Sequence, residues 1–288
     1  MGDLFSWPGL GTTVWVGLCL LTGAAVFAIA RLVRLDRRQK KLLLKRHLRH
    51  AWRWLEEHGL VEKNPALIPD YHRLYPELEI LERNFAVIQK ECRELMAGTQ
   101  GIPPIRIAGG PYTARGIHAA DWRTYWLKAG RFLEPNCARA PETTRLLEQI
   151  PGLTNAFFSI LGPHQRLRAH WGYYKGFYRY HLGLVVPDDN RDGHCWLRVN
   201  DDRRAYDKRI RRVIEDTPKY YWHEGEGVVF DDTFLHDAAN ESDLPRAVLF
   251  LDLRRPLPWY LHWPNVLFIA LAQLDPTVRT IRRDALVP

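Results

Sequence analysis

The segment GEGVVFDDTFLH, residues 225–236, predicts a turn, a short apolar strand and a loop that delivers a histidine, His236. Ten residues further on, Arg246 precedes a second apolar run, at 247–253. Other short apolar runs, separated by turn residues, occupy 156–161, 178–186 and 195–199. Runs of this length and spacing predict an antiparallel β sandwich or barrel.

The run RYHLGLVVP, residues 179–187, is strongly β-like. Because side chains alternate between the two faces of a strand, Arg179 and His181 are expected to point the same way. Two such groups on a buried face are costly unless they have a partner, and an anionic ligand would supply one. The alternative is that this face of the strand is simply exposed.

A further histidine, His170, stands in the sequence AHWG, where another strand is expected to end. With His236 it gives two candidate imidazole ligands, a type that suits iron(II). Non-haem iron oxygenases usually add a carboxylate, in the common form two positions after the first histidine, and that position is Gly172 here. Each histidine taken alone is more often a hydrogen-bonded core or surface residue than a ligand.

Arg246 stands at the mouth of an apolar strand. A guanidinium in that place suits a bidentate contact with a carboxylate ligand. The alternative is an edge-strand charge that discourages aggregation. The residues alone leave both interpretations open.

The runs at 179–187 and 227–236, with Arg246 at its ten-residue offset, resemble the aspartyl/asparaginyl β-hydroxylase family. The resemblance extends from about residue 120 to about residue 258. It implies an Fe(II)- and 2-oxoglutarate-dependent dioxygenase on a double-stranded β-helix, a jelly-roll or cupin-like fold. The family includes enzymes that hydroxylate protein domains, and bacterial membrane enzymes that 2-hydroxylate acyl chains of lipid A or ornithine lipids.

The resemblance also implies the roles of the site residues. Two histidines hold the iron in this family, with water in place of a carboxylate, so His170 and His236 match the metal ligands. The positions that match contacts to 2-oxoglutarate are Ser159, Arg179, His181, Arg246 and, with looser spacing, Trp122. Fe(II), 2-oxoglutarate and O2 would together hydroxylate a C–H bond and release succinate.

The N-terminal segment carries no charged residue between residues 4 and 30, and its apolar stretch 12–30 is about as long as a helix needs to be to cross a bilayer. The positive charges crowd residues 31–53, on its C-terminal side, whereas a signal peptide would carry them before a shorter apolar run. The positive-inside rule then places the catalytic domain on the cytoplasmic side of a single-pass anchor. Four scattered cysteines without a CxxC pair fit a reducing compartment.

The expected organisation is mainly β, with flanking helices and an N-terminal transmembrane helix. Residues 1–36 form the anchor and 37–110 a basic helical neck and linker. The dioxygenase domain spans 111–258, and 259–288 form an amphipathic tail that either lies on a membrane surface or packs on the barrel. Within the neck, helices are expected over 31–60, where Gly59 could end the first, and over 77–96.

The net charge of +8 without a zinc-finger or nucleotide-binding motif indicates a membrane bilayer and no nucleic acid as partner. The leading hypothesis for the substrate is an acyl chain of a membrane lipid. Alternatives are Asp or Asn in a protein or peptide, a small molecule, or a non-enzymatic membrane scaffold with a degenerate barrel. The sequence YYKG at 173–176 departs from the Pro-Thr-Asn that protein-directed family members have after the first histidine.

Overall fold

The computed structural model describes residues 36–98, 102–104, 121–172, 174–202 and 214–286. The chain divides into two compact units, 1–51 and 52–288. The anchor expected over 1–36 lies outside the described residues, apart from Asp36. Over the described ranges, no helix is both long enough and apolar enough to cross a membrane.

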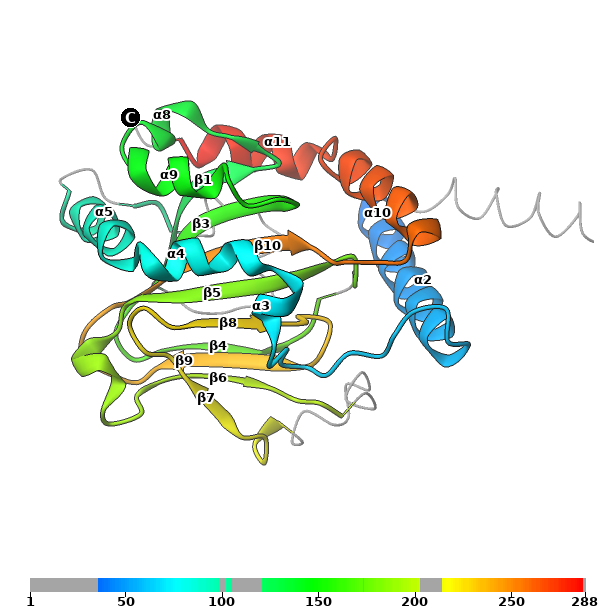
Figure 1. The fold of residues 1–288 in the computed structure, drawn as a ribbon, viewed down its shortest axis with the longest axis horizontal. Helices are drawn as coiled ribbons and strands as arrows, with labels where there is room; N and C mark the ends of the chain where they lie inside the picture. The colour runs from blue at the N-terminus through cyan, green and yellow to red at the C-terminus, as the bar shows by residue number, and fades with distance from the viewer. Residues whose placement is uncertain (1–35, 99–101, 105–120, 173, 203–213, 287–288) are drawn as a thin grey trace, which may run out of the picture. The chain divides into compact units, whose positions relative to one another are not determined.

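Two antiparallel sheets form the centre of the second unit (Figure 1). The larger sheet has the order β2 (Arg131–Phe132), β1 (Trp122–Ala129), β3 (Leu153–Leu161), β10 (Arg246–Arg254), β5 (Phe177–Val185) and β8 (Gly227–Phe230). The smaller sheet has the order β4 (Gln165–His170), β9 (His236–Asn240), β6 (Cys195–Val199) and β7 (Lys219–Tyr221). From β3 to β10 the chain crosses repeatedly between the two sheets, which is the strand order of an eight-stranded jelly roll. The predicted mainly β, jelly-roll core is therefore confirmed.

Helices occur both before and after the first strand, β1, along the sequence. Those before β1 are α2 (Arg37–Glu57), α3 (Tyr71–Leu74), η1 (Pro76–Leu78), α4 (Glu79–Arg83) and α5 (Phe85–Ala97). Those after it are α8 (Glu134–Cys137), α9 (Pro141–Leu147), η2 (Pro187–Asn190), α10 (Trp259–Ala272) and α11 (Pro276–Asp284). Gly59, with a φ of +69°, follows the end of α2 as predicted, because glycine adopts this left-handed conformation without strain.

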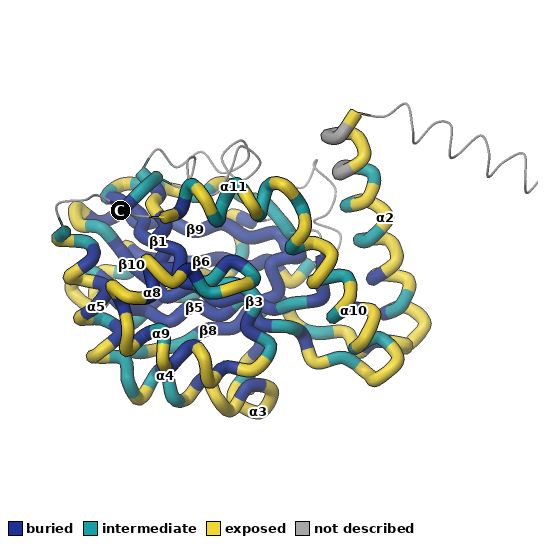
Figure 2. The backbone as a smooth tube through the Cα atoms, turned by 90° about the horizontal axis from the view of Figure 1, so that it is seen from above, coloured by how far each residue is buried: buried dark blue, intermediate teal, exposed yellow. Residues whose placement is uncertain are grey.

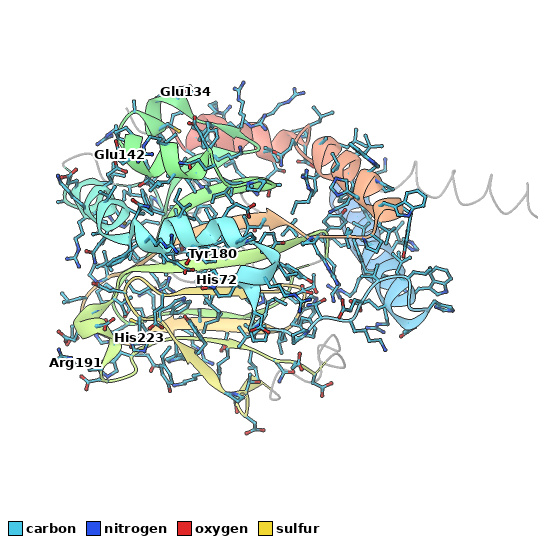
Figure 3. The ribbon with its side chains drawn as sticks, in the orientation of Figure 1. His72, Glu134, Glu142, Tyr180, Arg191 and His223 are labelled. Atoms are coloured by element: carbon cyan, nitrogen blue, oxygen red, sulfur yellow. The ribbon has the colours of Figure 1, made fainter. Side chains whose placement is uncertain are left out.

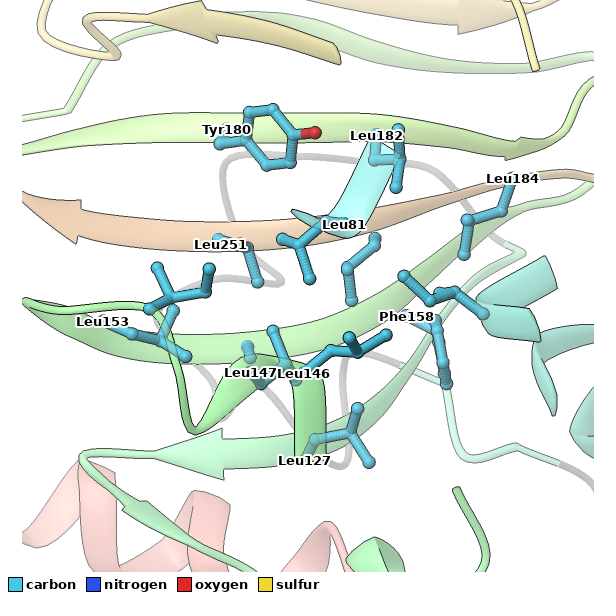
Figure 4. Close-up of a cluster of buried hydrophobic side chains, with 14 of the residues drawn as sticks. Leu81, Leu127, Leu146, Leu147, Leu153, Phe158, Tyr180, Leu182, Leu184 and Leu251 are labelled. Atoms are coloured by element: carbon cyan, nitrogen blue, oxygen red, sulfur yellow. The ribbon is translucent and has the colours of Figure 1, made fainter. Parts of the chain in front are cut away.

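The main core lies between the outer face of the larger sheet and the helices α4, α5 and α9. Figure 4 shows its leucines, phenylalanine and tyrosine packed between these elements. In α5 the buried Ile88, Cys92 and Leu95 recur at helical spacing, so one face of the helix meets the sheet. A second cluster, which includes Val248, Phe230 and Leu197, fills the space between the two sheets. Strand β10 is therefore buried on both faces along most of its length (Figure 2).

Two carboxylates, of the buried Glu91 and the half-buried Glu82, fix the helices in place. Glu91 of α5 accepts hydrogen bonds from the backbone N–H groups of Glu142 and Thr143, at 2.9 and 2.8 Å, and so caps the first turn of α9. Glu82 of α4 accepts a hydrogen bond from the hydroxyl of Tyr180 on β5, at 3.0 Å. The same carboxylate lies 2.8 Å from Nε2 of His72 (Figure 3). These contacts position the helical layer without any role in the candidate site.

Two sequence expectations differ in detail from the structure. The helix expected over 77–96 is divided into η1, α4 and α5, with a break at Asn84, whose φ and ψ of −102° and 19° are not helical. The strands β1, β4, β7 and β9 were not predicted from apolar runs. In β4 and β9 the polar sequences QRLRAH and HDAAN provide no such run, although both strands pair with their neighbours along the sheet.

Candidate active site

His170 and His236 face each other across two paired strands. His170 ends β4, His236 begins β9, and the two residues are direct partners in the antiparallel register. Their ring centroids are 4.1 Å apart. The predicted pairing of these two distant histidines is therefore present in the fold.

The hydrogen bonds of the two rings fix their tautomers. Nδ1 of His170 lies 2.7 Å from the carbonyl oxygen of Arg168, and Nδ1 of His236 lies 2.9 Å from that of Phe234. Because a carbonyl oxygen only accepts, each Nδ1 carries the proton and each Nε2 keeps its lone pair. This is the arrangement that orients imidazole for a metal ion.

Burial keeps both rings neutral. It lowers the pKa of His170 to about 4 and that of His236 well below its usual value. For His236 the neighbouring His170 and Arg179 lower the pKa further. Two adjacent neutral imidazoles can both act as ligands at neutral pH.

The space beside Gly172 is occupied by another residue. A Cβ atom at this position would overlap the carboxylate of Asp232, and the backbone N–H of Gly172 donates to the carbonyl oxygen of Asp232 at 2.6 Å. The carboxylate of Asp232 also lies 3.0 Å from Nη2 of Arg179. Within the described ranges, no three histidine, cysteine or acidic residues form a cluster that could hold a metal ion.

The buried guanidinium of Arg246 lies on the inner face of the larger sheet, ten residues after His236 in the sequence. Arg246 is almost fully buried, and burial lowers its pKa to about 10. Its guanidinium carbon lies 4.2 Å from the ring centroid of Trp222. Among the described residues, no carboxylate forms an ion pair with Arg246, and its Nε has no hydrogen-bond partner.

The neighbouring polar atoms also lack partners within the described chain. Both ring nitrogens of His181 and Nε1 of Trp222 are buried without a hydrogen bond to any described residue. Burial, and then Arg246 and Arg179, lower the pKa of His181 well below its usual value. Buried polar groups without a partner are rare, so this cradle of donors fits an anionic ligand that the chain itself does not provide.

Ser159 and Trp122 complete the cradle on adjacent strands. Val248 on β10 is paired with Ser159 on β3, so Ser159 shares the inner face with Arg246. Nε1 of Trp122 donates a hydrogen bond to the hydroxyl oxygen of Ser159 at 2.9 Å. Both side chains are buried.

Rings connect the cradle to the histidine pair. Phe230 is 5.0 Å from His181 and 5.6 Å from His236, measured between ring centroids. Arg179 lowers the pKa of both His181 and His236, and its Nε lies 3.4 Å from Oδ1 of Asp252. The residues predicted from the sequence thus form one continuous site, in which Arg179 is engaged by two carboxylates.

The loop that carries His236 is held from both sides. Oδ1 of Asp231 accepts hydrogen bonds from the N–H and hydroxyl of Thr233, at 2.9 and 2.6 Å, which closes a turn before the histidine. After the histidine, Asp237 accepts two hydrogen bonds from Arg198, at 2.9 and 2.6 Å. A buried bidentate pair of this kind restricts where β9 begins.

Sequence reasoning missed two members of the site. Asp232 stands in the quoted FDDTFLH run, but only the fold shows that its side chain reaches Gly172. Trp222 stands in KYYWHEGEG, where no spacing or pattern marks it. An acidic residue before a candidate metal-binding histidine was the available signal for Asp232.

The fold and site define a jelly-roll protein with a two-histidine centre beside an anion cradle. The model of the aspartyl/asparaginyl β-hydroxylase family matches residues 82–218 and 208–256, more than half of the chain. The chain therefore belongs to this hydroxylase family, as the sequence motifs predicted.

Relatives in the family differ in their substrates. The ornithine lipid ester-linked acyl 2-hydroxylase of Rhizobium tropici is 31% identical over 206 residues, covering 71% of this chain and 66% of that protein. The human aspartate beta-hydroxylase domain-containing protein 2 is 29% identical over 62% of this chain and 45% of its own length. Human aspartyl/asparaginyl beta-hydroxylase is 28% identical over 63% of this chain and 22% of its own length.

The aligned region thus spans between about a fifth and two thirds of these relatives. Among solved structures, a prolyl-4-hydroxylase of Pseudomonas putida is similar over 60% of this chain and 88% of its own, with 14% identity and a TM-score of 0.37. This similarity is low, and the jelly-roll fold is defined by the strand order of the chain itself.

Proposed function

We propose that this chain is an iron(II)- and 2-oxoglutarate-dependent hydroxylase that acts on an acyl chain of a membrane lipid. The observation that carries the cofactor assignment is the buried guanidinium of Arg246, without a carboxylate partner in the described chain, beside two histidines with free Nε2 lone pairs. A dicarboxylate bound at Arg246 and a metal ion bound at His170 and His236 would satisfy both groups at once.

Each residue has a defined task in this proposal. Nε2 of His170 and of His236 would hold iron. With 2-oxoglutarate and O2 the iron would supply an oxidation that places one oxygen atom in a C–H bond and the other in succinate, with release of CO2. Arg246 would bind the distal carboxylate of 2-oxoglutarate, and the hydroxyl of Ser159, oriented by Trp122, would donate to the same group.

His181 and Arg179 would line the remainder of the site. His181 is neutral, so it can donate one hydrogen bond to the cosubstrate without adding a charge. The resemblance assigned Arg179 to 2-oxoglutarate as well, but its ion pairs with Asp232 and Asp252 support a second task. Arg179 would hold the Asp232 carboxylate beside Gly172, at the edge of the metal position.

The lipid substrate is supported by the relative from Rhizobium tropici, whose name describes an acyl 2-hydroxylase. The segment 173–176 stands where protein-directed members have Pro-Thr-Asn, and the side chains that the structure describes there pack within the fold. Tyr174 packs on Phe268 with ring centroids 4.2 Å apart, and Lys175 is buried among carboxylates. Neither side chain is available to bind a peptide.

The proposed membrane location of the protein rests on the N-terminal sequence. We propose a single-pass anchor over 1–36, a basic neck and linker over 37–110, a catalytic domain over 111–258 on the cytoplasmic side, and a tail over 259–288. The basic residues that follow the uncharged segment support this orientation. A bilayer partner would bring the acyl chain to the catalytic domain.

The test compares the lipids of a strain that makes the protein with those of a strain that makes the His170→Ala variant. We expect a lipid species that gains one oxygen atom on an acyl chain only with the unchanged protein. Purified protein should also form succinate from 2-oxoglutarate in the presence of Fe(II), and the His236→Ala variant should not.

Other outcomes separate the alternatives. A one-oxygen gain on Asp or Asn of a peptide, with unchanged lipids, would favour the activity named in the human relative. Succinate formation that is the same with and without both histidines would contradict the iron site. No succinate and no change in lipids or peptides would favour a membrane scaffold.

A further inference from the structure

Helix α10 presents a stripe of large apolar side chains to solvent. Trp259, Trp263 and Leu267 are 80%, 70% and 60% exposed, and they recur every four residues along one side of the helix. Leu271 continues the stripe, and Leu274, just beyond the helix, is also exposed. In Figure 2 the helix is exposed or half-buried along almost its whole length, whereas the strands beneath α5 and α9 are buried.

The composition of this segment is unusual for a solvated helix. Residues 256–274 contain no Asp, Glu, Lys or Arg. Asn265, a polar residue, is the one buried residue of α10, and Phe268 packs on Tyr174. The large apolar side chains of the stripe, by contrast, are turned to solvent. A contiguous exposed apolar surface of this kind marks a binding site for a membrane or a partner.

The length of α10 excludes a membrane span. A helix of 14 residues is about 21 Å long, compared with about 30 Å for the hydrocarbon core of a bilayer. Trp259, Tyr260 and Trp263 are amphipathic aromatic residues, which are enriched where hydrocarbon meets water. The segment therefore has the properties of a helix that lies in the plane of the interface.

The next helix provides the complementary charge. Arg279 and Arg283 of α11 are exposed. Nε of Arg282 donates a hydrogen bond to the carbonyl oxygen of Ala129 at 2.7 Å, which fixes α11 on the end of β1. A cationic helix that directly follows an apolar one matches an anionic lipid surface, in which headgroups lie above hydrocarbon.

We propose that α10 lies in the interface of an anionic lipid bilayer, with the arginines of α11 against the headgroups. This contact is separate from the N-terminal anchor, and it does not depend on which substrate is hydroxylated. The bilayer is favoured over a protein partner because the exposed stripe has Trp side chains at one end, aliphatic side chains at the other, and a cationic flank.

The same helix is joined to the candidate active site. Asn265 donates a hydrogen bond to the carbonyl oxygen of Gly176 at 2.9 Å and accepts one from the hydroxyl of Tyr174 at 2.5 Å. These residues lie between His170 at the end of β4 and Arg179 on β5. A bilayer that holds α10 would therefore also hold the segment beside the metal position at the membrane surface.

The experiment uses the full chain with a single labelled cysteine. Cys92, Cys137 and Cys195 are buried, and Cys19 is replaced by Ser. An environment-sensitive fluorophore is attached at Leu267→Cys, and the matched control is Leu244→Cys, because Leu267 and Leu244 are 60% and 59% exposed. Both proteins are mixed with vesicles of phosphatidylcholine, with and without phosphatidylglycerol, that carry lipids with a quenching group in the acyl chain.

We expect a blue shift and strong quenching by these lipids at position 267, and neither change at position 244. Phosphatidylglycerol should increase the effect several-fold, and Arg279→Gln should reduce that increase. The proposal is overturned if aqueous iodide quenches both positions equally in the presence of vesicles. It is also overturned if position 267 shifts without vesicles and in proportion to protein concentration, because a second copy of the chain would then cover the stripe.

Failure of this proposal can be distinguished from failure of the proposed function. The fluorophore reports its surroundings whether or not the protein turns over 2-oxoglutarate. A variant with both Trp259→Ser and Trp263→Ser provides a second measurement, since it keeps Asn265 and its hydrogen bonds. This variant should lose most of the lipid quenching at position 267 while retaining its circular dichroism spectrum.

Discussion

The carboxylate of Asp232 fills the space that a Cβ atom on Gly172 would occupy. Gly172 is the position at which the common iron site of oxygenases carries its acidic ligand. Here an acidic side chain reaches the same place from the loop before β9 and is held there by Arg179, 3.0 Å from its Oδ2. The glycine is thus required by the packing of a neighbouring carboxylate.

The first prediction concerns this contact. In the variant Gly172→Ala the added methyl group overlaps Asp232, so the carboxylate and its ion pair with Arg179 must move. Because groups around a metal ligand affect it through orientation, we expect the affinity for Co(II) or Mn(II) to fall by about 10- to 100-fold. Calorimetric titration of the purified variant would measure the change.

The control for this prediction is the double variant Gly172→Ala, Asp232→Ala. Removal of the carboxylate makes room for the methyl group, so the double variant should bind the metal as Asp232→Ala does, with no further loss. Such non-additivity is expected of two residues in direct contact. Two losses that simply add would show that the effect of Gly172→Ala does not act through Asp232.

The second prediction concerns the buried guanidinium of Arg246. A buried cation without a paired charge is destabilising, and an apolar side chain of similar length would keep the packing on Trp222. We therefore expect Arg246→Met to raise the free energy of unfolding of the ligand-free protein by roughly 1–3 kcal/mol. Urea denaturation of both proteins would measure this difference.

Addition of 2-oxoglutarate should offset most or all of this difference in stability. A ligand at one hundred times its dissociation constant adds about 2.7 kcal/mol to the protein that binds it, and Arg246→Met should gain almost nothing. The matched control is Arg254→Met, at the other end of β10, which should retain the response. If 2-oxoglutarate stabilises Arg246→Met as much as the unchanged protein, the guanidinium does not bind it.

The third prediction concerns the pH dependence of metal binding. Burial holds the pKa of His170 near 4 and that of His236 far below its usual value, so both are already deprotonated well below neutral pH. Protons then compete with the metal only as the pH approaches 4. Two ordinary histidines with a pKa of about 6.5 would lose about 100-fold in affinity between about pH 7.5 and about pH 5.5.

We expect instead almost the same Co(II) affinity at both pH values. Absorption titrations in matched buffers would measure it, and a peptide with two exposed histidines provides the comparison. A fall of the size expected for ordinary histidines would contradict the neutral state of the pair.

The sequence predicted those parts of the fold that have a local signal. The strands β5, β6, β8 and β10 are rich in apolar residues and mostly buried, and they were predicted within one or two residues. Strands β4 and β9 are held by pairing with their neighbours rather than by apolar side chains, so no pattern marks them. Both candidate metal ligands nevertheless stand on these two strands, His170 at the end of β4 and His236 at the start of β9.

The site was predicted to a similar extent. His170, His236 and Arg246 stand at recognisable offsets, and the fold brings them to one face. The contact between Asp232 and Gly172 depends on how two loops approach, and residue spacing contains no information about that approach. The sequence also left the orientation of α10 open. Apolar residues lie on all sides of this helix, so no periodic pattern marks the face that packs on the rest of the protein.

The fourth prediction concerns a buried ion cluster behind the loop of His236. Nζ of Lys175 lies 2.7 Å from Oε1 of Glu56 and 3.1 Å from Oδ2 of Asp231, and all three side chains are buried. Burial alone would raise the pKa of Asp231, but Lys175 and the hydrogen bonds from Thr233 outweigh it and lower that pKa. Asp231 therefore stays ionised and keeps the turn before His236 closed.

Lys175→Met removes the cation that lies between the two buried carboxylates. We expect it to lower the free energy of unfolding at neutral pH by about 3–5 kcal/mol. The control Lys90→Met removes an exposed ion pair with Glu94 and should cost less than about 1 kcal/mol. Urea unfolding monitored by tryptophan fluorescence would measure both.

The pH dependence of this loss has a definite sign. In the unchanged protein the pKa of Asp231 is lower when folded than when unfolded, so its stabilising effect is present above the unfolded pKa and is lost as the pH falls through the folded pKa. Without Lys175, burial opposes ionisation with one charge fewer against it, so the folded pKa of Asp231 is higher in the variant and acid costs the variant less stability than it costs the unchanged protein. The difference in stability between the two proteins should therefore shrink as the pH falls from 7 toward about 4. A difference that stays constant or grows over this range would show that Lys175 does not act through the charge of Asp231.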